Sequence, residues 1–127
     1  MKPIVFLILM RFHKKNNIIK NAKKLAKENN IKIISSTPSV ELCFLLHYEY
    51  TTSNMTNKDV ISKLKVHFPN YDKNVNIYSD INKNVNDAIK RAKQLEKFQL
   101  SNGRIIGTVE ANPNTEIYKI VENLLNR

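Results

Sequence analysis

Two side chains that could take part in chemistry lie in the most apolar stretch of the chain, TPSVELCFLLHY at residues 37–48. Glu41 supplies a carboxylate near the head of this stretch, and His47 supplies an imidazole six residues later. A carboxylate can hold a hard metal ion, and an imidazole can move a proton near neutral pH. On a helix, however, six residues span roughly 240°, so the two groups cannot form a compact acid–base pair within one helix.

Both residues also have structural interpretations, and the sequence leaves the alternatives open. Glu41 could satisfy nearby backbone donors at the positive end of a helix dipole, or it could bind a metal ion or pair with Lys73. His47 could make a structural hydrogen bond or a favourable dipole contact near the end of the same helix. We therefore take Glu41 as a candidate catalytic residue and metal ligand, and His47 as a candidate catalytic residue.

The length and composition predict a single folded domain over residues 1–127, with 42% hydrophobic and 25% charged residues. The apolar run at residues 3–10 is far shorter than the roughly 20 residues that span a bilayer, and no signal-peptide cleavage site follows it. We expect a cytoplasmic protein with no membrane partner. Cys43 is the only cysteine, so a disulfide framework and a thiolate metal cluster are both excluded.

The net charge of +10 is compatible with a nucleic-acid partner, because clustered basic side chains neutralise phosphates. Of the 21 basic residues, 17 are Lys, and only four are Arg, the residue suited to bidentate phosphate recognition. Abundant Lys, Asn and Ile also follow from an AT-rich genome, whatever the function. Binding of DNA or RNA and a merely solvated Lys-rich surface remain alternatives.

The elements that would position these residues predict an α/β fold. Apolar runs at 4–10 and 31–35 predict two strands, and the amphipathic segment 14–30 between them predicts a crossover helix in a β-α-β unit with parallel strands. Thr37 and Pro38 resemble the N-cap and first turn of a buried helix that runs to residue 48. The remaining helices are expected at 57–68, 80–98 and 115–127, the last with Asn114 or Thr115 as its cap.

Two strands are few for a parallel sheet, because both of its edges would be bare. Either another chain completes the sheet, which leaves self-association open, or the sequence is an incomplete domain that lacks amino-terminal strands. Glu41, at the start of its helix, is expected near the carboxyl ends of the strands, where open α/β sheets bind their ligands.

Three separated motifs carry a family resemblance. The matching residues are Ser36, Pro38, Glu41, Leu45, Leu46 and His47 in the first motif, Tyr71 and Lys73 in the second, and Asn112, Pro113 and Thr115 in the third. Their order and spacing, over about residues 4–125, resemble the carboxy-terminal part of the RloB-like family, which includes the AbiLii abortive-infection proteins. The chain departs from the family pattern at Thr37, Val40 and Asn114.

The resemblance implies a Toprim-like domain that acts in phage defence with an ABC or SMC-like ATPase, and a nuclease activity. Such chemistry needs clustered carboxylates that hold magnesium. Met10 and Phe12 stand where the family has an Asp-x-Asp pair, and a further carboxylate belongs to a strand that this sequence does not contain. Asp72 and Asp80 are weak candidates for the further acids that such chemistry would need beside Glu41.

The second and third motifs supply the candidate nucleic-acid-binding residues, namely Tyr71, Lys73, Asn112 and Thr115. Local structure offers another explanation, because Asn112 before a proline favours a turn and Thr115 can cap the last helix. Three hypotheses follow from the sequence. The chain is a magnesium-dependent nuclease of an anti-phage system, a truncated and catalytically silent relative that serves as an interaction module, or a basic protein that binds nucleic acid without chemistry.

Overall fold

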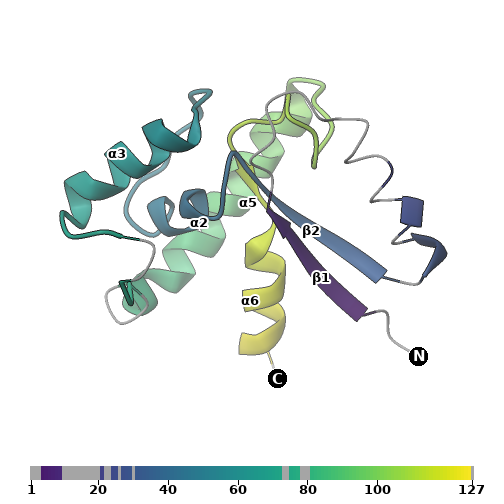
Figure 1. Ribbon diagram of the computed structural model, residues 1–127, viewed down its shortest axis with the longest axis horizontal. Coiled ribbons are helices and arrows are strands. Elements are labelled where there is room, and N and C mark those ends of the chain that lie inside the picture. Colours follow the sequence, from purple (N-terminus) through teal and green to yellow (C-terminus); the bar gives the residue numbers. More distant parts are fainter. Residues whose placement is uncertain are drawn as a thin grey trace.

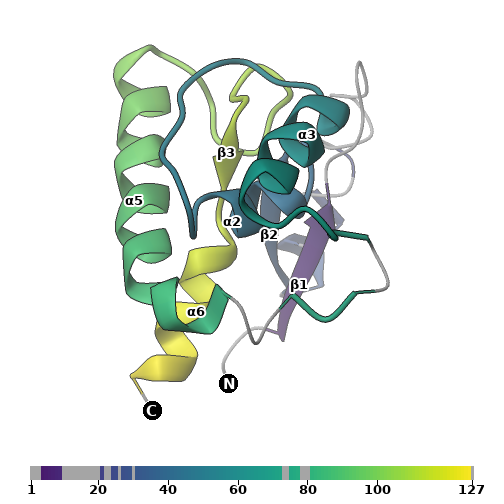
Figure 2. The same ribbon diagram turned by 90° about the vertical axis from the view of Figure 1, so that its left-hand side faces the viewer.

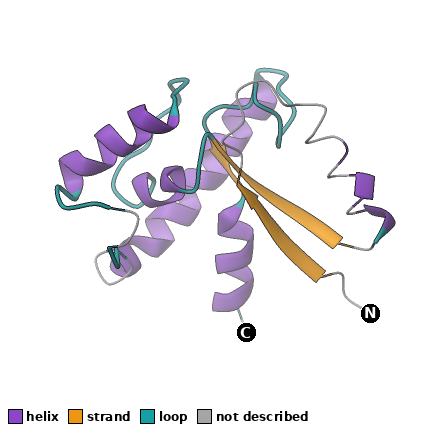
Figure 3. Ribbon diagram, viewed as in Figure 1, coloured by secondary structure: helices purple, strands orange, loops and turns teal. Residues whose placement is uncertain are grey.

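The computed structural model describes residues 4–9, 21, 24–25, 27–29, 31–72, 75–77 and 81–126. Within these ranges, strands lie at one side of the molecule and most of the helical residues lie at the other (Figures 1 and 3). The elements are β1 Ile4–Leu9, β2 Ile31–Thr37, α2 Glu41–Leu45, α3 Asn57–His67, the 3₁₀ helix η1 Asn82–Asn84, α5 Val85–Ser101, β3 Asn114–Thr115 and α6 Ile117–Leu125. The crossover helix predicted at 14–30 falls mostly outside the described residues.

The three strands form one mixed sheet in the order β1-β2-β3. β1 pairs with β2 in parallel, ending at Leu9↔Ser36, whereas β3 pairs with β2 antiparallel through Ser36↔Thr115 and Thr37↔Asn114. The prediction of a small Toprim-like parallel sheet is therefore wrong, because β3 runs against β2. β3 escaped prediction because a strand of two residues is too short to show alternating hydrophobicity.

The end of β2 and the start of α2 also differ from the prediction. Thr37 is the last residue of β2 rather than a helix N-cap. The N-cap of α2 is Val40, whose side chain makes no capping hydrogen bond, and the helix has five residues rather than about three turns. Polar residues followed by proline are typical of a helix start, but the same pattern here ends a strand. Arg91 closes the far end of the helical turn by donating to the Leu46 carbonyl over 2.8 Å.

The three longer helices confirm the predictions made from apolar periodicity. α3 begins after Thr56, whose hydroxyl accepts from the Asp59 N–H while the Asp59 carboxylate accepts from the Thr56 N–H. α5 and α6 each bury one stripe of side chains and expose the rest. Within the described residues, no helix combines the length and apolar character needed to cross a bilayer.

The apolar core lies where α2 meets α3 and α5, and Figure 2 shows α2 between the other two helices. Leu42 and Leu45 of α2 are completely buried, as are Val60 and Leu64 of α3 and Leu95 of α5. Burial of side chains of this size contributes about 1.5–3 kcal/mol each. This core fixes α2, and with it the first motif, against the end of the sheet.

Gln99 fastens α5 to the segment before β3. Its side chain is completely buried, donates to the Pro113 carbonyl over 2.7 Å, and accepts from the Arg104 guanidinium over 2.8 Å. At the next position along the sheet, the Glu116 N–H donates to the Ser35 carbonyl over 2.8 Å. β3 is therefore held from both sides although it contains only two residues.

We expect Gln99→Leu to lower the free energy of unfolding by about 2 kcal/mol, because it leaves the buried Pro113 carbonyl without its donor. Gln94→Leu is the matched control, since Gln94 lies on the same helix but is exposed. Urea unfolding followed by circular dichroism measures both variants. Equal losses for the two variants would contradict the role given to Gln99.

Candidate functional site

The three sequence motifs meet at the carboxyl end of β2. Antiparallel pairing sets Thr37 of the first motif opposite Asn114 of the third. The second motif joins them through Tyr71, whose hydroxyl donates to Glu41 Oε2 over 2.8 Å. We call the residues that the motifs contribute here the motif cluster. It comprises Ser36, Ser39, Glu41, Tyr71, Asn114 and Thr115, all of them buried.

Glu41 lies inside the protein rather than on its surface. Its side chain is only 2% exposed, and it occupies the first position of α2, where the helix dipole favours a negative group. Tyr71 reaches it from the segment after α3, and the Tyr71 ring packs against Phe44 at 6.2 Å between centroids. A buried carboxyl group requires such partners, because its desolvation is costly. Glu41 therefore links α2 to the segment that carries the second motif.

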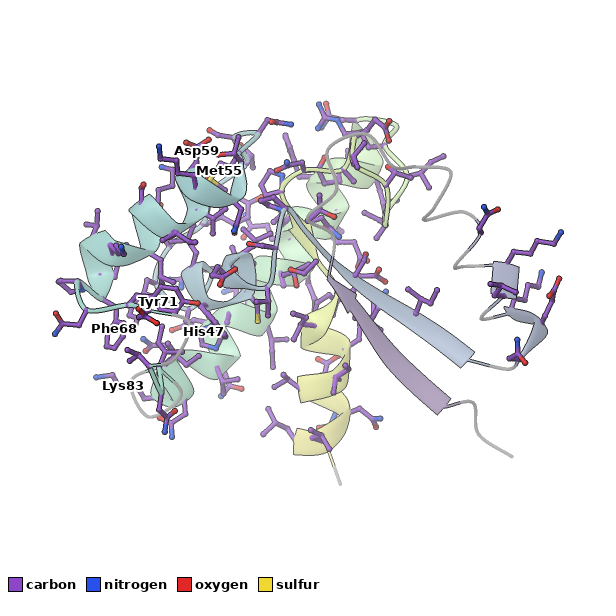
Figure 4. The ribbon with its side chains drawn as sticks, viewed as in Figure 1. His47, Met55, Asp59, Phe68, Tyr71 and Lys83 are labelled. Atoms are coloured by element: carbon purple, nitrogen blue, oxygen red, sulfur yellow. The ribbon has the colours of Figure 1, made fainter. Side chains whose placement is uncertain are left out.

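His47 does not contact Glu41 through any described hydrogen bond, and it faces a different part of the core. Its Nδ1 donates to the Cys43 carbonyl over 2.8 Å. Burial is the main cause that lowers the pKa of His47, and the hydrogen bond to Cys43 opposes this shift. Figure 4 shows His47, Phe68 and Tyr71 together on the side of the molecule away from β1 and β2. Glu41 and His47 therefore do not form an acid–base pair.

A small apolar pocket of about 20 Å³ lies beside His47. Its walls come from α2, α5, α6 and β3, and include Cys43, Leu46, Ala92, Thr115 and Val121. The pocket has room for about one water molecule and is too small for a nucleotide. Burial raises the pKa of the Cys43 thiol to about 12, so Cys43 remains protonated at neutral pH and is a poor nucleophile.

Asn112 has a structural role in the third motif. Its Nδ2 donates to the Met55 carbonyl over 2.7 Å, and its Oδ1 accepts from the Met55 N–H over 3.2 Å. Both functions of the amide are therefore used to hold the loop before α3. The sequence interpretation of Asn112 as a turn residue identified a structural role, but it did not identify Met55 as the partner.

Asn114 differs from Asn112 although the two belong to the same motif. Asn114 is 2% exposed, and neither its Oδ1 nor its Nδ2 makes a hydrogen bond with the described residues. The Ser39 hydroxyl, which is completely buried, lacks a partner in the same sense. An unpaired buried polar group costs about 1–3 kcal/mol, so folded proteins retain few of them. Asn114 and Ser39 are the functional candidates that the sequence interpretation missed, since Ser39 occupied an unassigned motif position and Asn114 was a departure from the pattern.

The other predicted nucleic-acid-binding residues are placed as follows. Tyr71 is buried against Glu41, and Thr115 is buried with its hydroxyl accepting from the Ile117 N–H over 3.3 Å. Thr115 thus lies next to the start of α6, whose N-cap is Glu116. Lys73 lies outside the described residues, as do Asp80 and the Met10 and Phe12 positions. Asp72 is exposed.

Magnesium, which the family resemblance implied, does not fit the described residues. Glu41 is the one carboxylate in the motif cluster, and it already accepts a hydrogen bond from Tyr71. Among the described residues, no three His, Cys, Asp or Glu side chains come together in a group that could hold a metal ion. Magnesium sites in phosphoryl-transfer enzymes take one or two carboxylates together with substrate oxygens. The one carboxylate of the motif cluster is buried and bonded to Tyr71.

We expect His47 to titrate below its ordinary pKa of 6.5, because burial disfavours the imidazolium. The unfolded chain then binds more protons than the folded chain between the two pKa values. The stability that depends on neutral His47 is present above pH 6.5 and is lost as the pH falls through the lowered pKa. Nuclear magnetic resonance of the His47 ring measures the pKa. His47→Gln is the control, and its stability should fall less with acid than that of the natural chain. A midpoint at or above 6.5 would contradict the burial of the ring.

Comparison with known proteins identifies a family for this chain. Residues 10–124 match the family described as RloB-like protein. No curated protein and no solved structure gives a significant match to the chain. The matched range includes all three motifs and every member of the motif cluster. This chain belongs to the RloB-like family.

Proposed function

We propose that this chain is a nucleic-acid-binding component of an anti-phage, abortive-infection system that works beside an ATPase. Membership of the RloB-like family is consistent with phage defence. The binding function rests on a different observation, the unequal distribution of charge along the chain. Residues 1–32 contain nine Lys or Arg residues and a single acidic residue, Glu28. This segment therefore carries +8 of the total net charge of +10.

The position of the end of β1 supports the proposal. Leu9, the last residue of β1, pairs with Ser36 of the motif cluster. In the sequence, Leu9 is followed by Arg11, Lys14 and Lys15, which lie outside the described residues. Ligands of open α/β sheets bind at the carboxyl ends of the strands, and phosphates bind where basic side chains concentrate. Contact with DNA or RNA phosphates at this edge is the function that the geometry supports best.

Two versions of this function differ in whether the chain cuts its ligand. The described residues do not fit a magnesium site, which favours a catalytically silent relative over a magnesium-dependent nuclease. In the catalytically silent version, this chain binds the nucleic acid and the ATPase performs the energy-dependent steps. α6 offers a surface that such a partner could contact, because Leu124 and Leu125 are each 56% exposed. Exposed apolar side chains in neighbouring positions are typical of a protein–protein contact.

We expect the purified chain to bind fluorescent single-stranded DNA and RNA with an affinity that falls steeply between about 50 and about 200 mM salt. Replacing Lys14, Lys15 and Lys20 with Gln should weaken binding and reduce the salt dependence by up to about three phosphate contacts. The matched control replaces Lys58, Lys63 and Lys65 of α3 with Gln, which removes the same charge. Absence of binding at the lower salt concentration, or equal losses in the two triple variants, would contradict the proposal.

We expect no magnesium-dependent cleavage of labelled DNA or RNA by the chain, with Glu41→Gln indistinguishable from the natural sequence. The physical reason is that Glu41 is buried and bonded to Tyr71. Gel electrophoresis after incubation with magnesium, with and without the neighbouring ATPase, measures the products. Cleavage that disappears in Glu41→Gln would show that the chain is the nuclease and would refute the silent version.

A further inference from the structure

Asn114 and Ser39 are the polar groups at the carboxyl end of β2 that have no hydrogen bond within the described residues. Their neighbours are satisfied. Ser36 Oγ donates to the Ser39 carbonyl over 2.7 Å, and Ser35 Oγ donates to Glu116 Oε1 over 2.9 Å. Among the described residues of the motif cluster, Asn114 is the side chain whose donor and acceptor atoms both lack a hydrogen bond. In folded proteins, groups of this kind are usually satisfied by another protein group, a water, an ion or a ligand.

The chemistry of the Asn114 amide narrows the class of ligand. Its plane carries one acceptor oxygen beside two donor hydrogens. A phosphate oxygen offers only acceptors and would leave Oδ1 unpaired, whereas a metal ion would bind Oδ1 and leave Nδ2 unpaired. A ligand that satisfies both atoms must present a donor beside an acceptor. In nucleic acids this arrangement occurs on base edges, and adenine is the usual partner of an Asn side chain.

We propose that the Asn114 amide binds the edge of an adenine base, with the Ser39 hydroxyl supplying a third hydrogen bond. This inference rests on the proposed nucleic-acid function and names the base that the site would take. The adenine donates from its N6 amino group to Oδ1 and accepts at N7 from Nδ2. Adenine occurs both in polynucleotides and in free nucleotides, and the two sources share this chemistry.

Access to Asn114 requires a local opening, because the side chain is 2% exposed. β3 contains only two residues and pairs with β2 through two positions. This opening also strains the hydrogen bonds from Gln99 to Pro113 and from Glu116 to Ser35, so the open form is a minor population. Separation of β3 from β2 would expose Asn114 at the carboxyl end of β2. Binding of the base is therefore expected to be slower than the diffusional encounter with the phosphates.

The experiment compares oligonucleotides of about twelve nucleotides that contain only adenine, thymine or cytosine, each titrated by fluorescence anisotropy. The natural chain should bind the adenine oligonucleotide about tenfold more tightly than the other two. Asn114→Leu should remove this preference and leave the binding of the thymine oligonucleotide unchanged. Titration with adenosine monophosphate tests the free-nucleotide source, with the Asn114 side-chain amide resonances as the readout.

Asn112→Leu is the matched stability control, because both Nδ2 and Oδ1 of Asn112 bond to the Met55 backbone. Asn112→Leu should lower the thermal unfolding midpoint, whereas Asn114→Leu should leave it unchanged or raise it. A purely structural Asn114 would instead behave like Asn112. If Asn114→Leu does not fold, Ser39→Ala replaces it, with loss of the adenine preference as the expected result.

The outcomes separate this inference from the proposed function. Equal binding of all three oligonucleotides, or an adenine preference that survives both substitutions, overturns the inference and leaves nucleic-acid binding intact. No binding of any oligonucleotide refutes the proposed function. In that case a shift of the Asn114 amide resonances on addition of adenosine monophosphate supports the adenine site, and no shift overturns it.

Discussion

The hydrogen bond between Tyr71 and the buried carboxyl group of Glu41 is the interaction on which the candidate site depends. A carboxyl group that is 2% exposed is tolerated only where partners compensate its desolvation. Tyr71 supplies one partner across 30 positions of sequence, and it draws the segment after α3 onto the start of α2. Since α2 follows β2 directly, this contact sets the second motif beside the end of the sheet. Pairing of Thr37 with Asn114 then brings in the third motif.

Much of the fold follows from patterns that the sequence shows directly. Apolar periodicity predicted α3, α5 and α6, and continuous apolar runs predicted β1 and β2. The errors lie where a local pattern has two structural solutions. Thr37 and Pro38 were taken as a helix start, although β2 continues to Thr37. The sheet was expected to be parallel because β3 was not predicted. A strand of two residues shows no pattern of its own, and β3 is held by hydrogen bonds to Gln99 and Ser35.

The candidate site was predictable in its parts but not in its connections. Glu41 and Tyr71 were separate candidates, and no local rule indicates that they bond to one another. Asn112 and Asn114 have the same side chain within one motif, yet the Asn112 amide bonds to Met55, whereas the Asn114 amide makes no hydrogen bond with the described residues. Which of two equivalent residues is satisfied depends on long-range packing. The sequence therefore identified the motifs, whereas the structure separates their structural members from their candidate binding members.

A double-mutant cycle on Glu41→Gln and Tyr71→Phe tests the central interaction most directly, with free energies of unfolding measured for the natural chain, both single variants and the double variant. Residues in direct contact within a buried network couple by about 0.5–3 kcal/mol. We expect a coupling energy of at least about 1 kcal/mol between Glu41 and Tyr71. Additive effects of the two substitutions would contradict the contact that joins the motifs.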